Sequence, residues 1–324
     1  MNRIALVIGA TGGIGGETAR ALLAAGWTVR ALNRNPERAR RELPEVEWLQ
    51  GDAMSQAEVV AAAQGVSVVV HAANPPGYKN WRGLALPMLE SSIAAAKSAG
   101  ARIVLPGTVY NFGPDAPELI DESAPQNPLT RKGKIRVAME ERLREASRDG
   151  TPVLIVRAGD FFGPRAKNNW FSQGLVKPGR ALRSVTYPGD HEASHAFAYL
   201  PDLAKAIVAL LDRAADLQPF EVFHFAGHDF ERGVEIAEAT RRVAGVPSAP
   251  IRRFPWFAIY LLSPVIETFR EMLEMRYLWQ RPLRLDNRKL RAFLGAEPHT
   301  PLDQALRMTL DALGCTSPSS SPSS

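Results

Sequence analysis

The stretch Ile4-Ala5-Leu6-Val7-Ile8-Gly9-Ala10-Thr11-Gly12-Gly13-Ile14-Gly15 decides the fold. Its first five residues form a continuous apolar run, which is typical of a β-strand buried on both faces. The spacing Gly9-x-x-Gly12-x-x-Gly15 follows at once, and a helical pattern then runs from 14 to 25. Glycines at this spacing permit a tight turn and a close approach of the backbone to a pyrophosphate, which the helix N-terminus attracts. The stretch therefore predicts a nucleotide-binding strand–loop–helix unit.

Short apolar runs and helical patterns alternate beyond this unit. Further strands are expected over 27–32, 46–49, 66–70, 103–105 and 153–156. Long helices are expected over 82–99 and 134–148. Repeated β-α-β units with apolar strands predict an α/β fold, a Rossmann-type doubly wound parallel sheet.

The second half of the sequence is less regular. We expect a helix over 203–211 that Asp202 caps, a strand over 221–226 and a helix over 234–243. The expected division is a Rossmann core of residues 1–160, completed by about 186–226, and a smaller C-terminal substrate lobe. The lobe takes residues 161–185 and 227–315, and the Ser/Pro-rich tail 316–324 is expected to be disordered.

Composition narrows the functional classes. The single cysteine, Cys315, rules out a disulfide framework and a cysteine zinc site, and it favours a reducing, cytoplasmic setting. The net charge of +5 is modest, and no basic stripe with interleaved aromatic residues indicates nucleic-acid binding. The apolar run 254–266 is too short to span a bilayer and is broken by Pro255 and Pro264. A buried helix packed in the lobe is its favoured interpretation, a membrane-surface contact the minor alternative, and stable membrane insertion is not expected.

The end of the second strand distinguishes between the two nicotinamide dinucleotides. An NAD site usually places a carboxylate there for the ribose hydroxyls. This chain instead reads Ala31-Leu32-Asn33-Arg34-Asn35, without an acid and with Arg34 where a 2′-phosphate requires a cation. The sequence therefore predicts NADP(H) as the cofactor, against the alternative of an ordinary exposed loop arginine.

Several segments together resemble the extended short-chain dehydrogenase/reductase family, of the NAD(P)-dependent epimerase/dehydratase type. Besides the glycine loop they are Gly51-Asp52-Ala53, His71-Ala72-Ala73, Thr108-Val109-Tyr110, the run 157–164 and the run 199–204. The resemblance covers most of the chain. It implies cofactor contacts from Gly9, Thr11, Gly12, Gly13, Ile14, Gly15, Asn33, Arg34, Asp52, Ala53, Ala72, Ala73, Arg136, Ala158, Gly159 and Phe161.

The chain departs from that family at its usual catalytic pair. The family carries Tyr-x-x-x-Lys on the long helix after the fifth strand, with a serine or threonine nearby. Aligned through Glu140, the tyrosine position holds Lys132 and the lysine position holds Arg136. Pro106 stands at the usual serine position, with Thr108 close by. The ordinary proton donor is therefore missing.

Four residues are the candidates for chemistry: Thr108, Tyr110, Lys132 and Arg136. Lys132 could donate a proton if burial lowered its pKa, but a solvated basic patch at a loose helix start is the favoured interpretation. Arg136 keeps its charge and could hold the cofactor ribose. Thr108 could bind a substrate oxygen, and Tyr110 is the nearest phenol to the expected nicotinamide, although a structural role is as well supported.

The remaining histidines and aromatic residues carry weaker signals. The pairs His191/His195 and His224/His228 have spacings that could bind a metal on a helix, but no metal site is expected. His195 is interpreted as a pocket residue or as a buried polar group with a hydrogen-bond partner, and Asp160 as a turn residue. Four aromatic residues either line an apolar substrate pocket or form the core of the lobe: Trp170, Phe171, Tyr187 and Phe197.

Two functions follow from these observations. The first is an NADP(H)-dependent oxidoreductase or epimerase-like enzyme with an atypical active site, acting on a small apolar or carbonyl-bearing molecule. The second is a non-catalytic NADP-binding sensor or regulator, which the missing Tyr-x-x-x-Lys pair favours. The sequence leaves a homodimer open.

Overall fold

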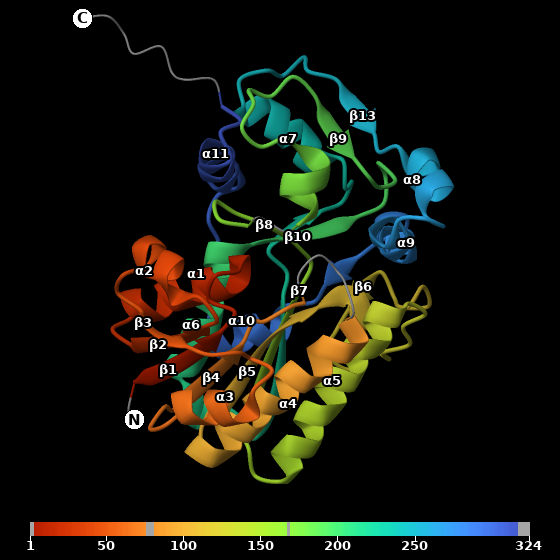
Figure 1. Cartoon of the computed structure of the whole chain (residues 1–324). Helices are drawn as coiled ribbons and strands as arrows, with labels where there is room; N and C mark the ends of the chain where they lie inside the picture. Colours follow the sequence, from red (N-terminus) through yellow and green to blue (C-terminus); the bar gives the residue numbers. More distant parts are fainter. Residues whose placement is uncertain (1–2, 76–80, 167–168, 317–324) are drawn as a thin grey trace, which may run out of the picture.

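The computed structural model describes residues 3–75, 81–166 and 169–316. Figure 1 shows two layers of helices around a central sheet, with a smaller lobe above the carboxyl ends of its strands. All paired strands of the sheet are parallel. Their order is β11-β7-β5-β4-β1-β2-β3. The predicted α/β doubly wound fold is confirmed.

The sheet strands follow the apolar runs of the sequence. They are β1 (Ile4–Ile8), β2 (Thr28–Asn33), β3 (Glu47–Gln50), β4 (Val68–His71), β5 (Arg102–Thr108), β7 (Val153–Ala158) and β11 (Phe220–Phe225). Side chains alternate between two buried clusters, so that Val70 packs on one face of the sheet and Val69 on the other. This two-sided burial explains why the strands read as continuous apolar runs rather than as alternating ones.

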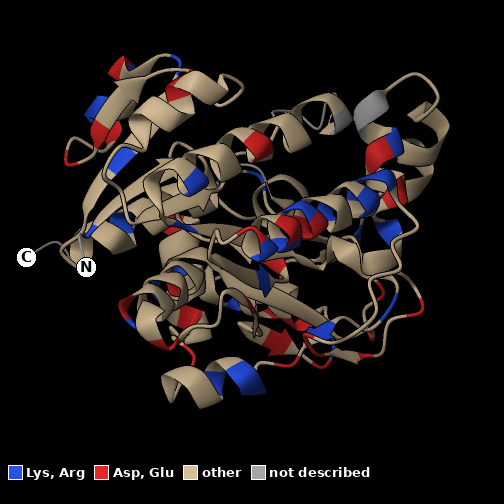
Figure 2. Ribbon diagram, turned by 90° about the horizontal axis from the view of Figure 1, so that it is seen from below, with Lys and Arg blue, Asp and Glu red and all other residues tan. Residues whose placement is uncertain are grey.

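Helices cover both faces of the sheet. The helices α1 (Gly13–Ala24), α6 (Leu200–Asp212) and α10 (Arg288–Leu294) contribute to the cluster on one face. The helices α3 (Gln56–Ala62), α4 (Trp81–Ala99) and α5 (Arg131–Arg148) cover the other. The short helix α2 (Pro36–Glu42) follows β2. Figure 2 shows charges of both signs interspersed over the helices in view.

The lobe is built from short strands and helices. Its strands are β8 (Asp160–Phe162), β9 (Val185–Tyr187), β10 (His195–Tyr199), β12 (His228–Phe230) and β13 (Ile251–Arg253). Its helices are η3 (Phe171–Leu175), α7 (Glu235–Val243), α8 (Trp256–Leu262), α9 (Glu267–Glu274), η5 (Arg276–Trp279) and α11 (Leu302–Ala312). The remaining short elements are η2 (Val109–Asn111), β6 (Leu119–Ile120), η4 (Ala214–Asp216) and β14 (Arg284–Leu285).

The chain passes between core and lobe several times. After β7 it enters the lobe and returns through β10 and α6, and after β11 it enters the lobe again. Leu290 of α10 then packs in the core, whereas Leu306 and Leu310 of α11 complete the apolar cluster of the lobe. Tyr187 of β9 and Phe197 of β10 also belong to the lobe cluster, so three segments pack differently from the division expected from the sequence: β9, β10 and α10.

Two local expectations are wrong. The helix α6 begins at Leu200, so Asp202 lies in its first turn rather than at the cap. Asp202 instead accepts hydrogen bonds from the backbone amide and the hydroxyl of Thr300, which tie the loop before α11 to the core. The run 254–266 forms α8 and the following turn, but most of its apolar side chains are exposed rather than buried. The expected disordered tail falls largely on 317–324, outside the described residues.

Candidate active site

The glycine loop adopts the geometry that close backbone contacts demand. Gly9 has a φ of +91°, which favours glycine, and a Cβ there would lie 2.6 Å from the carbonyl oxygen of Ala72. A Cβ on Gly15 would lie 2.2 Å from the carbonyl oxygen of Gly9. Gly12 donates its backbone amide to the Gly9 oxygen at 2.9 Å and caps α1. The turn thus brings the N-terminus of α1 directly beneath the carboxyl end of β1.

A groove of about 450 Å³ lies along this loop. It is situated where the strand order reverses, because β1 pairs with β2 on one side and with β4 on the other. Such a switch point is where doubly wound sheets bind nucleotides. Eight predicted cofactor contacts line the groove: Gly9, Thr11, Gly12, Gly13, Ile14, Ala72, Ala73 and Phe161. The open glycine cradle and the exposed helix N-terminus fit a dinucleotide pyrophosphate.

The other predicted cofactor contacts lie outside that lining. Asn33, Arg34, Asp52 and Ala53 are at or just beyond the carboxyl ends of β2 and β3. Arg34 is exposed and forms no ion pair with a described residue. Asp52 accepts a hydrogen bond from the backbone of Met54 at 2.9 Å, which shapes the turn after β3. Their contacts with a cofactor stay predictions.

Three more predicted contacts are packed beneath the groove. Gly15 and Ala158 are buried in the core. A Cβ on Gly159 would lie 2.2 Å from the carbonyl oxygen of Ala196, so this glycine permits close packing against β10. These positions shape the floor of the site rather than line it.

A smaller cavity of about 90 Å³ shares residues with the groove. Ile14, Ala72, Ala73, Asn74, Trp81 and Phe161 line both spaces. Thr108, Tyr110, Pro106, Arg136 and His71 line only the small cavity. The structure therefore brings three of the four candidate catalytic residues together at one end of the groove.

Arg136 is held beside this cavity by contacts from α5. Its side chain is 5% exposed, and Nη2 donates a hydrogen bond of 2.9 Å to Oδ1 of Asn74. The guanidinium also lies 5.2 Å from the ring centroid of Trp81. A guanidinium keeps its charge at any pH that the fold survives. Arg136 therefore places a fixed positive charge where the groove and the small cavity meet.

Lys132 has a different environment from the expected solvated patch. It is 3% exposed, and its Nζ lies 3.2 Å from Oε2 of Glu271 in α9. Burial lowers the pKa of Lys132 from its ordinary value, while the charge of Glu271 opposes that effect. A Cβ on Gly133 would lie 2.4 Å from the carbonyl oxygen of Tyr110, so the start of α5 is tightly packed, not loose. The expectation of a solvated, loose helix start is wrong.

A second contact joins α9 to the beginning of α5. Glu274 accepts a hydrogen bond of 3.0 Å from the backbone amide of Arg131, and Arg131 Nε lies 3.1 Å from its other oxygen. Glu271 and Glu274 therefore direct two carboxylates of the lobe toward the helix that carries Lys132 and Arg136. The ion pairs tie the lobe to the core beside the small cavity.

His71 is a feature of the cavity that sequence reasoning did not single out as a site residue. Its Nδ1 lies 2.8 Å from Oγ of Ser92, whose hydroxyl donates to the carbonyl oxygen of Met88 at 3.1 Å. The Nδ1 therefore carries the hydrogen, and Nε2 is a buried acceptor without a partner among the described residues. Burial, and then the charge of Arg136, lowers the pKa of His71 to about 3. Such an acceptor fits a donor group brought by a ligand or water.

Two buried histidines, His195 of the lobe and His224 of the core, have hydrogen-bond partners within the fold. His195 is buried, hydrogen-bonds to Asp160 with Nε2 2.8 Å from Oδ2, and stacks on Trp279 at 4.3 Å. This confirms its interpretation as a satisfied polar group. His224 of β11 accepts a hydrogen bond at Nε2 from Nη1 of Arg157 at 3.0 Å and donates one from Nδ1 to the carbonyl oxygen of Ile120 at 3.0 Å. Within the described ranges no three His, Cys, Asp or Glu side chains are grouped to hold a metal ion.

The four lobe aromatic residues belong to an apolar cluster. Phe171, Tyr187 and Phe197 are buried in it, and Trp170 packs against it. Of the two interpretations left open by the sequence, the structure supports the lobe core.

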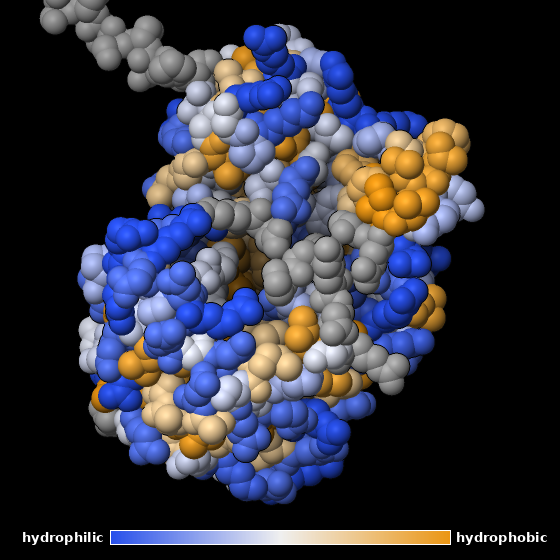
Figure 3. Space-filling model, viewed as in Figure 1, coloured by the Kyte–Doolittle hydropathy of each residue, from blue (hydrophilic) through white to orange (hydrophobic). Residues whose placement is uncertain are grey.

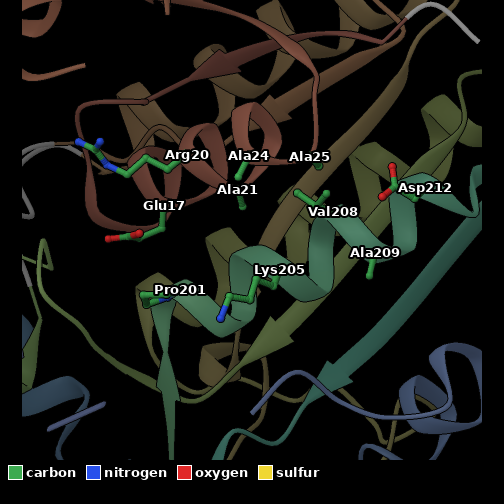
Figure 4. Close-up of a pocket in the computed structure, with 10 residues that line it drawn as sticks. All are labelled: Glu17, Arg20, Ala21, Ala24, Ala25, Pro201, Lys205, Val208, Ala209 and Asp212. Atoms are coloured by element: carbon green, nitrogen blue, oxygen red, sulfur yellow. The ribbon is translucent and has the colours of Figure 1, made fainter. Parts of the chain in front are cut away.

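A separate hollow lies between α1 and α6 (Figure 4). Its volume is about 450 Å³, and Ala21 and Ala24 of α1 face Val208 and Ala209 of α6 across it, with Glu17, Arg20, Lys205 and Asp212 at its edges. Its lining residues come from the outer surface of the two helices, so this hollow is distinct from the groove at the glycine loop.

The family assignment agrees with this geometry. Residues 5–226 match the model of the NAD-dependent epimerase/dehydratase family. The chain belongs to this family. The match covers the glycine loop, the candidate catalytic residues and the sheet up to β11, and it confirms the resemblance drawn from the motifs.

Known proteins show the same fold at low sequence identity. A UDP-glucose 4-epimerase from Bifidobacterium longum, solved with NAD+ and UDP, superimposes with a TM-score of 0.72 and 18% identity, covering 95% of this chain and 97% of that one. A UDP-glucuronic acid 4-epimerase from Bacillus cereus, solved with UDP-glucuronic acid and NAD, gives a TM-score of 0.72 and 18% identity, with coverages of 96% and 98%. At this identity the likeness shows the fold.

A sequence relative is the uncharacterized UDP-glucose epimerase YtcB of Bacillus subtilis (strain 168). It is 24% identical over 167 residues, which are 48% of this chain and 52% of the relative. The chain thus matches about half the length of that protein.

Proposed function

We propose that the protein is an NADP(H)-dependent oxidoreductase or epimerase-like enzyme that acts on a small molecule bearing a carbonyl or secondary hydroxyl group. One observation carries the proposal: a groove that fits a dinucleotide leads into a small cavity lined by Thr108, Tyr110 and Arg136. Family membership and the NAD named with the solved neighbours support a nicotinamide dinucleotide as the cofactor, and the choice of NADP(H) rests on Arg34. A nicotinamide cofactor, when bound, supplies hydride transfer.

The residues of the chain divide the remaining work. The backbone at Gly9 and Gly12 and the N-terminus of α1 would hold the pyrophosphate. Arg136, fixed by Asn74, would hold the ribose as a permanent cation, in the position where the family has a lysine. Thr108 and Tyr110 would place hydroxyl groups at the substrate oxygen, where Tyr110 moves the proton and Thr108 orients the oxygen.

Arg34 supports NADP(H) rather than NAD(H). It is exposed beyond the end of β2, without an ion-pair partner among the described residues and without a neighbouring carboxylate at 33–35. A guanidinium there can grip a 2′-phosphate with two hydrogen bonds. Fluorescence titration should give tighter binding of NADPH than of NADH. Arg34→Ala should lower the ratio of the two affinities about tenfold, which corresponds to the free energy of about one hydrogen bond to a charged group. Equal affinities in the unaltered protein contradict this choice of cofactor.

A panel of small carbonyl compounds tests the activity. We expect NADPH oxidation with at least one member of the panel, loss of turnover in Tyr110→Phe with retained NADPH binding, and retained turnover in Lys132→Met. If Tyr110→Phe retains turnover and Lys132→Met loses it, Lys132 rather than Tyr110 is the proton donor.

The second candidate function is a non-catalytic NADP-binding sensor. The observation that favours it is the Lys132–Glu271 pair, because the family's proton-donor position is filled by an internal ion pair between core and lobe. Binding of NADPH without turnover of any compound in the panel, together with a change in the exposure of α9 to proteolysis on binding, is the outcome that selects it.

A further inference from the structure

Exposed apolar side chains are concentrated on α8 and the turn that follows it. Among the described residues ten large apolar side chains are exposed, and six of them fall between 257 and 266. These six form the α8 patch: Phe257, Tyr260, Leu261, Leu262, Val265 and Ile266. Val265 is 86% and Phe257 81% exposed, whereas only Ile259 of α8 is buried. Figure 3 shows this patch as a continuous hydrophobic surface over α8.

Such a patch requires an explanation because the exposure of apolar surface to water costs free energy. Single exposed leucines are normal on a protein surface, but contiguous apolar patches mark contact sites. The short α8 has apolar residues around its whole circumference, so turning the helix would not bury them. Pro255 and Pro264 bound the segment, and Trp256 attaches its beginning to the lobe through a hydrogen bond to the carbonyl oxygen of Pro188. Figure 1 shows α8 at the outer edge of the lobe.

Unpaired positive charges border the patch. Arg252 and Arg253 lie at the end of β13, five and four residues before Phe257, and Arg270 lies in α9, four residues after Ile266. All three are exposed and form no ion pair with a described residue. The carboxylates of Glu271 and Glu274 are engaged by Lys132 and Arg131 on the side of the core. The exposed side-chain charges without an ion-pair partner that the structure describes on the flanks of α8 are therefore positive.

We propose that the α8 patch docks the protein on an anionic lipid membrane surface. Aromatic and aliphatic side chains would enter the boundary between headgroups and acyl chains, and Arg252, Arg253 and Arg270 would contact lipid phosphates. No helix in the described ranges has the length and apolar character of a membrane span, so the contact is peripheral. The Lys132–Glu271 pair connects α9, next to the patch, with the helix that lines the candidate active site.

Vesicle co-sedimentation with the whole protein tests this proposal. We expect binding to vesicles of phosphatidylcholine that contain phosphatidylglycerol, weaker binding to phosphatidylcholine alone, and a decrease with added salt. The triple variant Phe257→Ser, Leu261→Ser and Val265→Ser should lower vesicle affinity at least about tenfold, since three side chains lose their transfer to the interface. Met54→Ser, which removes an exposed apolar side chain after β3, is the matched control and should bind as the unaltered protein does.

Charge is tested separately from the apolar residues. Arg252→Gln with Arg253→Gln should weaken binding to the anionic vesicles and flatten its salt dependence, while binding to phosphatidylcholine alone stays unchanged. Equal circular dichroism and NADPH affinity of all variants would show that the fold is retained.

Two results overturn the proposal. One is the absence of co-sedimentation of the unaltered protein with anionic vesicles. The other is a homodimer in light scattering that the triple variant converts to a monomer while vesicle binding is absent, which assigns the patch to a second copy of the chain. Vesicle co-sedimentation and light scattering do not depend on NADPH turnover. The proposed enzymatic function and the proposed membrane docking can therefore be refuted independently of each other.

Discussion

The buried pair of Lys132 and Glu271 allows a quantitative prediction. Nζ and Oε2 lie 3.2 Å apart, and the two side chains are only 3% and 11% exposed. Removing one partner leaves the other charge in a poorly hydrated place. We therefore expect Lys132→Met and Glu271→Leu each to destabilise the protein, because each leaves one buried charge uncompensated.

The size of the effect follows from that burial. Breaking a buried ion pair from one side typically costs about 3–5 kcal/mol of the free energy of unfolding. An unfolding entropy of about 2.1 cal/mol/K per residue gives roughly 0.7 kcal/mol/K for a chain of this length. Each single variant should therefore lower Tm by roughly 4–7 °C. The double variant, which replaces both charges by apolar groups, should lie within about 1–2 kcal/mol of the unaltered protein.

A double-mutant cycle by thermal and urea unfolding measures this coupling. The matched control is the exposed pair of Arg242 and Asp303, whose side chains are 56% and 52% exposed. Arg242→Gln should change the free energy of unfolding by less than about 1 kcal/mol. Additive losses in the Lys132/Glu271 double variant would refute the reasoning, because they would show that the two groups do not compensate each other.

Three further predictions concern the site. Gly12→Val should abolish NADPH binding and leave the circular dichroism spectrum unchanged, because Gly12 lines the groove and a side chain there would fill space that the pyrophosphate needs. Binding at ordinary affinity would show that the site is misplaced. Arg136→Ala should weaken NADPH binding about tenfold or more in fluorescence titration, while Lys132→Ala changes it little; the reverse order would exclude Arg136 as the ribose ligand. The pKa of His71 is lowered from 6.5 to about 3 in the folded protein, so the unfolded chain takes up a proton first as the solution is acidified. Stability should therefore fall as pH decreases from about 6.5 towards 3, and urea unfolding of His71→Gln should show a shallower decrease; an unchanged slope contradicts the assignment.

Most of the sheet could be predicted from the sequence because its signals are local. Continuous apolar runs mark strands buried on both faces, and Gly9, Gly12 and Gly15 mark the turn at the switch point. The groove residues from Gly9 to Ile14 followed from the same turn, whereas Ala72, Ala73 and Phe161 were expected from the resemblance to the family. Local spacing and backbone geometry were sufficient for the glycine loop.

The remainder depends on contacts between residues far apart in the sequence. The sequence predicts a solvated Lys132 because its counterion, Glu271, lies 139 positions later. The two side chains meet only because α9 packs against α5. The sequence predicts that Asp202 caps α6, whereas its carboxylate accepts hydrogen bonds from Thr300. The exposure of α8 is a tertiary fact as well, since an apolar helix is usually buried.

The repeated crossing of the chain between core and lobe limits how this protein can be divided. Neither part is one continuous piece of sequence, because lobe elements interrupt the core between β7 and α6 and again between β11 and α10. During synthesis the apolar cluster of the lobe stays incomplete until Leu306 and Leu310 have left the ribosome, when every strand of the central sheet is already present. The apolar cluster of the lobe can therefore close only after the core strands have been synthesised, and a graft of the lobe onto another Rossmann domain would require more than one segment of the chain.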